Sequence, residues 1–136
     1  MIDPIAKETM MFSHSEFVVT IDQYGRGVGE TPRMNGLVWS VHARPVAEAA
    51  SRLGAFAIEA STKATRTQIL DATGLNGAVD TDYWPRVDLH GVDGSVTGSK
   101  TLVAVANEAV AIVLDAATDQ AGKSVAVSVV IYGAPI

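Results

Sequence analysis

The chain has 136 residues, a formal net charge of −5 and no cysteine. This fits one ordinary domain and excludes disulfides and thiolate metal sites. Nucleic acid and anionic membrane surfaces are not expected as partners, because the chain is acidic and contains no basic run. Charged residues make up only 18% of the chain, against about 25% in typical domains. Since a small soluble protein stays dispersed through a charged exterior, we infer that part of its surface is covered in the working state.

Residues 1–15 are interpreted as an N-terminal arm, and residues 16–136 as a single domain. Pro4 interrupts any early strand, and the apolar residues follow no regular period. No basic start precedes an apolar core, so a signal peptide is not expected, and no apolar run is long enough to span a bilayer. The arm is expected either to fold onto its own core or to reach a neighbouring subunit. Its candidate contact residues are Ile2, Ile5, Met10, Met11 and Phe12.

Three stretches in the first half of the domain alternate between apolar and polar side chains, which is the pattern of half-buried strands. These predicted strands are residues 16–22, 37–42 and 55–61. The side chains expected to face the core are Phe17, Val19 and Ile21, then Leu37, Trp39 and Val41, then Phe56 and Ile58.

The remaining segments of this half are predicted to be connections or a helix. Residues 23–36 contain four glycines and a proline and are predicted to form a loop. Pro45 suits a first helical position, and the Ala-rich run behind it predicts a short helix over 45–53. Residues 63–70 are compatible with a strand or a helix, and residues 71–78 are predicted to be a loop.

The second half is predicted to consist of strands. A short strand places Val87 and Leu89 inward, and three longer strands follow it. These are residues 101–106, 109–115 and 125–132. The first two are expected to pair as a hairpin across Asn107-Glu108. A rival helix over 101–117 is disfavoured, because β-branched side chains lose rotamer freedom in a helix and pack well on a sheet.

About seven or eight short strands, separated by Gly, Asn and Asp turns, predict an all-β fold. The predicted architecture is an antiparallel β-sandwich or jelly roll with at most one or two short helical turns. The alternative is an α+β domain.

Two glycine-containing segments resemble phosphate-binding loops without the context that such loops need. Residues 117–124 fit a relaxed phosphate-loop pattern with Ala in place of the first glycine, but a strand follows where a helix is required. We expect a hairpin turn there, with Gly122 at a positive φ and Lys123 solvated. Residues 25–29 (GRGVG) lack a βαβ setting and are expected to be a flexible loop.

The acidic and histidine residues show no spacing typical of a metal or catalytic site. The acids Asp80, Asp82, Asp88 and Asp93 do not match a calcium loop and are expected to form a solvated acidic edge. The three histidines are His14, His42 and His90, and no two lie at helix-turn spacing. No nucleophile-elbow sequence is present. We therefore expect no enzyme activity, no cofactor and no metal.

The surface properties favour a protein interface. Tyr83-Trp84 is expected either to cap one end of the sandwich or to anchor a partner. The outward sides of two predicted strands, 109–115 and 125–132, are small and nearly uncharged, so they should pack against another sheet, a second subunit or a larger assembly. The candidate interface residues of the domain are Tyr83, Trp84, Ala109, Ala111, Val113, Ala126, Ser128 and Val130.

The arm MIDPIAKETMMF, the strands rich in Ala, Val, Thr and Gly, and the ending GSKTLVAVANEAVAIVLDAATDQAGKSVAVSVVIYG carry a family resemblance. The chain resembles the small capsid cementing (decoration) proteins of tailed bacteriophages with a jelly-roll fold, such as that of a Bordetella phage. The resemblance implies a virion protein, made in the host cytoplasm, that binds the outside of an assembled head. It also implies a homodimer or trimer that clamps neighbouring subunits of the major capsid protein.

Two rival functions remain open at this stage. One is another phage structural component, such as a head–tail connector or a tail protein, which would form closed rings. The other is a small carbohydrate-binding jelly roll. That function needs a concave pocket with converging polar and aromatic groups, for which Tyr83, Trp84, Asp82 and His90 are the candidates.

Overall fold

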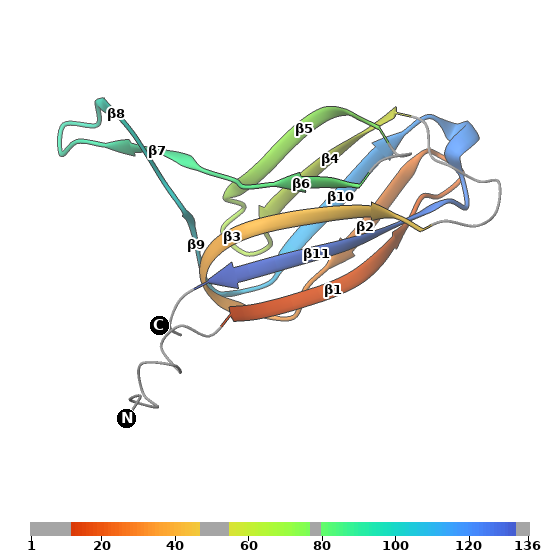
Figure 1. The fold of residues 1–136 in the computed structure, drawn as a ribbon, viewed down its shortest axis with the longest axis horizontal. Helices are drawn as coiled ribbons and strands as arrows, with labels where there is room; N and C mark the ends of the chain where they lie inside the picture. Colours follow the sequence, from red (N-terminus) through yellow and green to blue (C-terminus); the bar gives the residue numbers. More distant parts are fainter. Residues whose placement is uncertain (1–11, 47–54, 77–79, 133–136) are drawn as a thin grey trace.

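The computed structural model describes residues 12–46, 55–76 and 80–132. Over these residues two sheets face each other, and a hairpin extends away from them (Figure 1). The strands of the first half are β1 (Phe12–Thr20), β2 (Arg26–Glu30), β3 (Met34–Pro45), β4 (Ala55–Thr62) and β5 (Gln68–Asn76). Those of the second half are β6 (Thr81–Tyr83), β7 (Val87–His90), β8 (Val96–Thr101), β9 (Val103–Glu108), β10 (Val110–Ala116) and β11 (Ser124–Tyr132), with a 3₁₀ helix η1 (Thr118–Gln120) between the last two.

The strand order is that of a jelly roll. The first sheet runs β1-β11-β3, and the far edge of β3 pairs with β6 along residues 41–43 and with β9 along residues 34–38. The second sheet runs β2-β10-β4-β5, and all these pairings are antiparallel. If β6 and β9 are counted as two halves of one strand, consecutive strands alternate between the sheets except at the β4–β5 hairpin. This is the eight-stranded double-sheet arrangement, so the predicted fold class is confirmed.

One hydrophobic core lies between the sheets. β11 alternates as predicted, and each of its inward side chains is at most 1% exposed. These side chains are Val125, Val127, Val129 and Ile131. They share the core with Ile58 of β4 and with Ile112 and Leu114 of β10. Burying one such side chain contributes about 1.5–3 kcal/mol.

The inward faces predicted for the first and third strands are also confirmed. Their buried side chains are Val19, Ile21, Phe56 and Ile58, and Phe17 packs half-buried against them. The position of β1 corrects the predicted arm, because the strand begins at Phe12 and pairs with β11 from that residue onward. The rest of the arm, residues 1–11, lies outside the described residues.

Two further segment predictions are wrong or fall outside the described residues. The segment 71–78, predicted as a loop, is strand β5 as far as Asn76. The predicted helix over 45–53 lies outside the described residues except at its start, where Pro45 is the last residue of β3.

In β7, Val87 packs against the core as predicted, but Leu89 is exposed.

The predicted hairpin between residues 101–106 and 109–115 does not form. β9 pairs with β3 in the first sheet, whereas β10 pairs with β2 and β4 in the second. β9 continues to Glu108, which pairs with Met34, so the chain crosses between the sheets at Ala109. Just before the crossing, Asn107 is an extra residue in β9, and its φ of 51° is in the left-handed region that asparagine tolerates better than most residues. Its backbone N–H donates to Asn35 Oδ1 at 2.6 Å. Asn107 and Glu108, predicted as the turn, are therefore the last residues of β9, and the connection to the second sheet follows them at Ala109.

The carboxylate of Glu108, which is 7% exposed, fastens the β4–β5 turn to this crossing. Oε1 accepts hydrogen bonds from the backbone N–H groups of Ala64 at 2.9 Å and Thr65 at 3.1 Å, and Oε2 accepts one from the Thr65 hydroxyl at 3.0 Å. These bonds, led by the one from the Thr65 backbone, lower the pKa of the Glu108 carboxyl. The carboxylate thus links an end of the first sheet to a turn of the second.

We expect Glu108→Gln to lower the urea midpoint at neutral pH and to flatten its acid dependence. Because the folded-state pKa lies below the ordinary value of 4.5, the stabilisation is complete above that value and is lost as the pH falls through the folded-state pKa. Urea unfolding measured from about pH 7 down to about pH 3 tests this. Glu59→Gln, at an exposed position of β4, is the matched control and should retain the wild-type pH profile. An unchanged profile in Glu108→Gln would contradict the assignment.

The segment 23–36, predicted as a loop, contains strand β2, and its glycines permit the strand rather than break it. A Cβ at Gly27 would lie 2.7 Å from Val19 Cγ1 and 2.9 Å from the Thr20 carbonyl oxygen, and one at Gly29 would lie 2.7 Å from the Phe17 ring. β2 and β1 belong to different sheets. Their close approach along the edge of the sandwich therefore requires residues without side chains.

We expect Gly27→Ala to destabilise the fold by about 1–3 kcal/mol, because the added methyl group overpacks a contact that includes backbone. Urea unfolding at constant pH measures the change. Val28→Ala, at the exposed neighbouring position of the same strand, is the control and should change stability by no more than about 0.5 kcal/mol. Equal stability of Gly27→Ala and wild type would show that the two strands can separate without cost.

Candidate functional site on the outer face of the first sheet

A bulge in β3 determines which aromatic side chains reach the surface. Ser40 pairs with Val130 and Val38 pairs with Ile131, so Trp39 is an extra residue between them. An extra residue reverses the alternation of side chains along a strand. Val38 and Val41 are both buried, whereas Leu37 and Trp39 are exposed. The prediction that Leu37 and Trp39 face the core is therefore wrong, and that for Val41 is right.

The two tryptophans of the chain lie on this outer face, each supported by neighbouring side chains. Trp39 is 41% exposed and Trp84 is 55% exposed. The Trp39 ring centroid lies 5.5 Å from that of Tyr132, and the guanidinium of Arg86 lies 5.5 Å from it. Trp84 meets the ring of His42 edge-on, with centroids 6.5 Å apart. Of the predicted pair, Trp84 is thus at the surface, while Tyr83 packs half-buried against the core, where burial raises its pKa.

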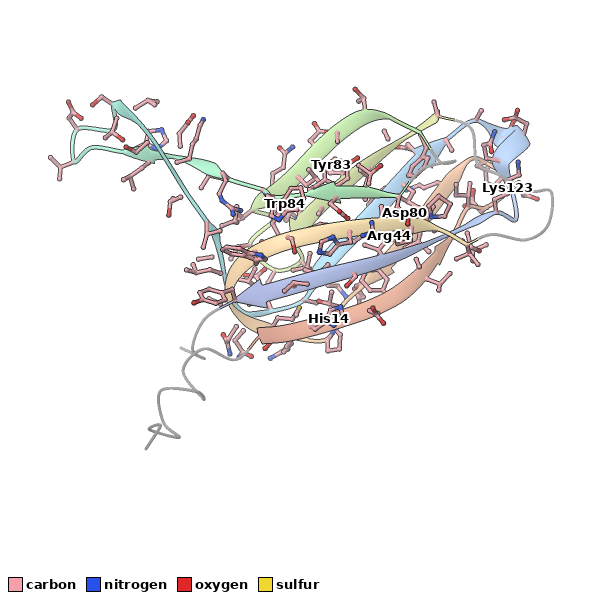
Figure 2. All side chains as sticks on the ribbon, in the orientation of Figure 1. His14, Arg44, Asp80, Tyr83, Trp84 and Lys123 are labelled. Carbon is pink, nitrogen blue, oxygen red and sulfur yellow. The ribbon has the colours of Figure 1, made fainter. Side chains whose placement is uncertain are left out.

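These side chains border a shallow depression of about 520 Å³. Its floor and walls come from β1, β3, β11 and the residue after β6, which the jelly-roll order places side by side. The lining residues are His14, Trp39, Ser40, His42, Trp84 and Val130. Figure 2 shows His14 on β1 and Trp84 where the chain leaves β6. Sequence reasoning found Trp84 and Val130, and it missed Trp39 because of the bulge.

A chain of polar contacts runs across the sheet beside the depression. Ser40 Oγ lies 2.8 Å from His42 Nε2, and His42 Nδ1 lies 2.7 Å from Asp82 Oδ1. Arg44 Nη2 lies 2.5 Å from the same Asp82 oxygen, and Arg44 Nε lies 3.5 Å from Asp80 Oδ2. Figure 2 shows Arg44 and Asp80 next to each other. The hydrogen bond from His42, followed by that from Arg44, lowers the pKa of Asp82.

The order Ser40, His42, Asp82 is that of a hydrolase triad, but its setting differs from one. A triad needs a serine that a carbonyl carbon can reach, with donors aimed at the oxyanion. Ser40 is 1% exposed and lies within a strand that is paired with β11. We interpret the three residues as a polar network that fixes the His42 ring.

We expect Ser40 to remain unmodified by a fluorophosphonate reagent, because its hydroxyl is covered. Intact-protein mass spectrometry after incubation at neutral pH measures this. Wild type and Ser40→Ala should both show no adduct. An adduct present in wild type and absent from Ser40→Ala would show a reactive nucleophile and contradict the expectation that the chain is no enzyme.

The predicted acidic edge is not one feature. Asp80 and Asp82 pair with Arg44 on the sheet. Asp88 pairs with Lys100, which lowers its pKa through their hydrogen bond. Asp93 accepts hydrogen bonds from the hydroxyl and backbone N–H of Ser95, and the hydroxyl bond leads in lowering its pKa. His90 belongs to β7, so the sugar pocket predicted from Tyr83, Trp84, Asp82 and His90 does not form as a set.

The remaining candidate interface residues divide between opposite faces. Ala126, Ser128 and Val130 lie half-buried on the outer face of the first sheet. Ala111 and Val113 lie half-buried on the outer face of the second, and Ala109 directly precedes β10. The second sheet also has exposed charged side chains around them: Arg26, Glu30, Glu59, Asp71 and Asp115. Of Phe12 only the backbone is described, and Ile2, Ile5, Met10 and Met11 lie outside the described residues.

The hairpin of β7 and β8 is a second surface feature. It extends from the sandwich between the two halves of the split strand (Figure 1). Every residue of β8 is exposed, and Leu89, Val92 and Val96 place large apolar side chains in solvent. Val87 at its base packs against the core, whereas the hydrogen bond from the Thr97 hydroxyl to the Leu89 carbonyl oxygen, at 2.8 Å, lies within the hairpin.

Two kinds of site are not found within the part of the chain that the structure describes. No group of three or more His, Asp or Glu side chains is arranged to hold a metal ion. No helix there is long and apolar enough to cross a membrane. In the segment 117–124, which forms η1 and a turn, Gly122 has the predicted positive φ, at 83°. The predicted hairpin does not form there, because the segment connects β10 and β11 of different sheets. Lys123 is half-buried rather than solvated, and its Nζ lies 3.3 Å from Gln120 Oε1.

No protein-family model matches the sequence, and no curated protein matches it either. Among solved structures, the chain is similar to one in the virus-like particle of extra small virus from the giant freshwater prawn Macrobrachium rosenbergii. The identity is 12%, over 89% of this chain and 78% of that one, with a TM-score of 0.33.

A second similar structure is that of infectious bursal disease virus, Gx strain. The identity is 11%, over 93% of this chain and 30% of that one, with a TM-score of 0.27. The chain therefore spans less than a third of that protein's length. Both structures are viral, but because both TM-scores lie below 0.5, the function proposed below rests on other observations.

Proposed function

We propose that the chain is a virion structural protein, and specifically a cementing protein that binds the outside of an assembled phage head. It would join neighbouring subunits of the major capsid protein, as a homodimer or trimer. The observation that carries the proposal is the β7–β8 hairpin, which places apolar side chains beyond the sandwich. The resemblance to jelly-roll cementing proteins and the low charge content of the chain agree with it.

A hairpin of this kind is suited to clamping a partner. A two-stranded hairpin is marginally stable on its own in water, and β7 and β8 pair only with each other among the described strands. If the hairpin packed against a capsid subunit, the exposed side chains of Leu89, Val92 and Val96 would become buried. That burial would also stabilise the hairpin. A small contact of this type becomes strong when one oligomer engages several sites at once, because the later contacts are intramolecular.

The acidic surface is consistent with a position outside the shell. A net charge of −5 gives no electrostatic attraction to the phosphates of packaged nucleic acid. A protein lining the interior would be expected to carry a basic face instead.

We expect the purified chain to bind preformed shells of the major capsid protein from the same virion. It should bind at a fixed number of copies per shell and raise the temperature at which the shells rupture. Sedimentation with shells and a thermal release assay measure these two properties. The double variant Val92→Asp and Val96→Asp should lose binding, because it places charges at two exposed apolar positions of the hairpin. Val28→Asp, at an exposed position of the second sheet, is the matched control and should bind as wild type does.

Three outcomes would contradict the cementing function. Wild-type protein that does not bind expanded shells would end it. Closed shells formed by this chain alone would identify it as the shell protein itself. Closed rings, measured by native mass spectrometry, would favour a connector or tail component.

A further inference from the structure

We propose that the depression on the outer face of the first sheet binds a neutral pyranose sugar. This goes beyond the cementing function, which depends on the hairpin. The observation behind it is that both tryptophans of the chain, although far apart in sequence, line one concave surface together with His14, Ser40 and His42.

The aromatic surfaces are exposed and held in place. Trp84 is 55% exposed and Trp39 is 41% exposed, although large indole rings are strongly buried on average. Tyr132 and Arg86 pack against Trp39, and Arg86 Nη1 also donates to the Trp39 carbonyl oxygen at 3.3 Å. These contacts orient the Trp39 ring, and the edge-on contact with His42 supports Trp84. Little side-chain entropy is therefore lost on binding.

Polar groups lie next to the rings, as recognition of hydroxyl groups requires. His14 contacts the Ser128 hydroxyl and lies 3.5 Å from Glu16 Oε1 at the β1 side of the depression. Asp82 does not line the depression itself, but it contacts the lining residue His42 through Oδ1. Its side chain is 38% exposed, so the carboxylate can accept from a ligand hydroxyl that reaches beyond the lining residues. A pyranose has C–H groups on its faces and hydroxyls around its rim, which matches flat apolar rings bordered by donors and acceptors.

The charges beside the depression favour a neutral ligand. Arg44 is paired with Asp80 and Asp82. Arg86 lies over the Trp39 ring, and its Nη1 donates to the Trp39 and Pro85 carbonyl oxygens. The lining residues themselves include neither lysine nor arginine, whereas a phosphate or carboxylate would need a cation among them. The volume of about 520 Å³ lies within the range of about 300–1,000 Å³ that small-molecule sites span.

The two indole N–H groups make the test direct, since the chain has only two tryptophans. We expect both indole signals in ¹H–¹⁵N spectra to shift saturably when the methyl glycosides of glucose, galactose, mannose and N-acetylglucosamine are titrated in turn, with at least one giving a Kd of about 1 mM. Trp84→Ala should weaken that binding about tenfold. Tyr24→Ala, at an exposed aromatic residue that does not line the depression, is the matched control and should bind as wild type does.

The competing occupants produce different results. No saturable shift with any of the four glycosides, or shifts that persist in Trp84→Ala, would overturn the proposal. Stronger binding of glucuronate or of adenosine than of any neutral glycoside would overturn the assigned ligand class. Indole shifts that depend on protein concentration without sugar would assign the face to a second copy of the chain and also overturn it.

The sugar site and the cementing function fail independently. Glycoside binding is measured on the chain without shells, and the hairpin variant Val92→Asp and Val96→Asp should retain it. Trp84→Ala should in turn retain shell binding. If Trp84→Ala lost shell binding while wild type bound no glycoside, the face would belong to the capsid contact instead.

Discussion

The structure depends on the burial of one side of β11. This strand lies between β1 and β3 and pairs with each along most of its length. Its four inward side chains are at most 1% exposed, so a shift of one residue would turn Val125, Val127, Val129 and Ile131 toward solvent. That penalty fixes the register of the first sheet, and through it the places where β3 can bulge and where β6 and β9 can pair.

Two departures from regular pairing create the surface features. The bulge at Trp39 in β3 moves an indole from the core side to the outer face. The interruption between β6 and β9, where residues 84–102 leave the sheet, produces the β7–β8 hairpin and leaves Trp84 at its base. Both occur on the same stretch of β3. The second sheet shows exposed charges on its outer face instead, so the proposed interaction surfaces are concentrated on one side and one end of the molecule.

The two sheets differ in the charge of their outer faces, which the low charge content of the whole chain does not show. The small, uncharged outward residues of 109–115 and 125–132 appear to form one surface in the sequence, but β10 and β11 lie in different sheets. On the second sheet, Glu59 and Glu30 lie beside Val113 and Ala111 in the pairing register. On the first sheet, the exposed aromatic side chains of Trp39 and Trp84 lie near Val130 and make that part of the outer face largely apolar. A strand's own composition therefore describes a surface only together with the strands paired to it.

The sequence by itself determined the fold class and most of the core. Alternation placed Val19, Ile21, Phe56, Ile58 and the inward side of β11 correctly, because a side-chain period of two follows from local backbone geometry. The tertiary structure decided the rest. Gly27 and Gly29 look like loop residues until β1 is seen packed against them. Likewise Trp39 looks like a core residue until the pairing with β11 reveals the extra residue, and the depression it borders depends on strands from both ends of the chain. Bulges, crossings between sheets and shared surfaces arise from pairing between distant segments, and no local pattern encodes that pairing.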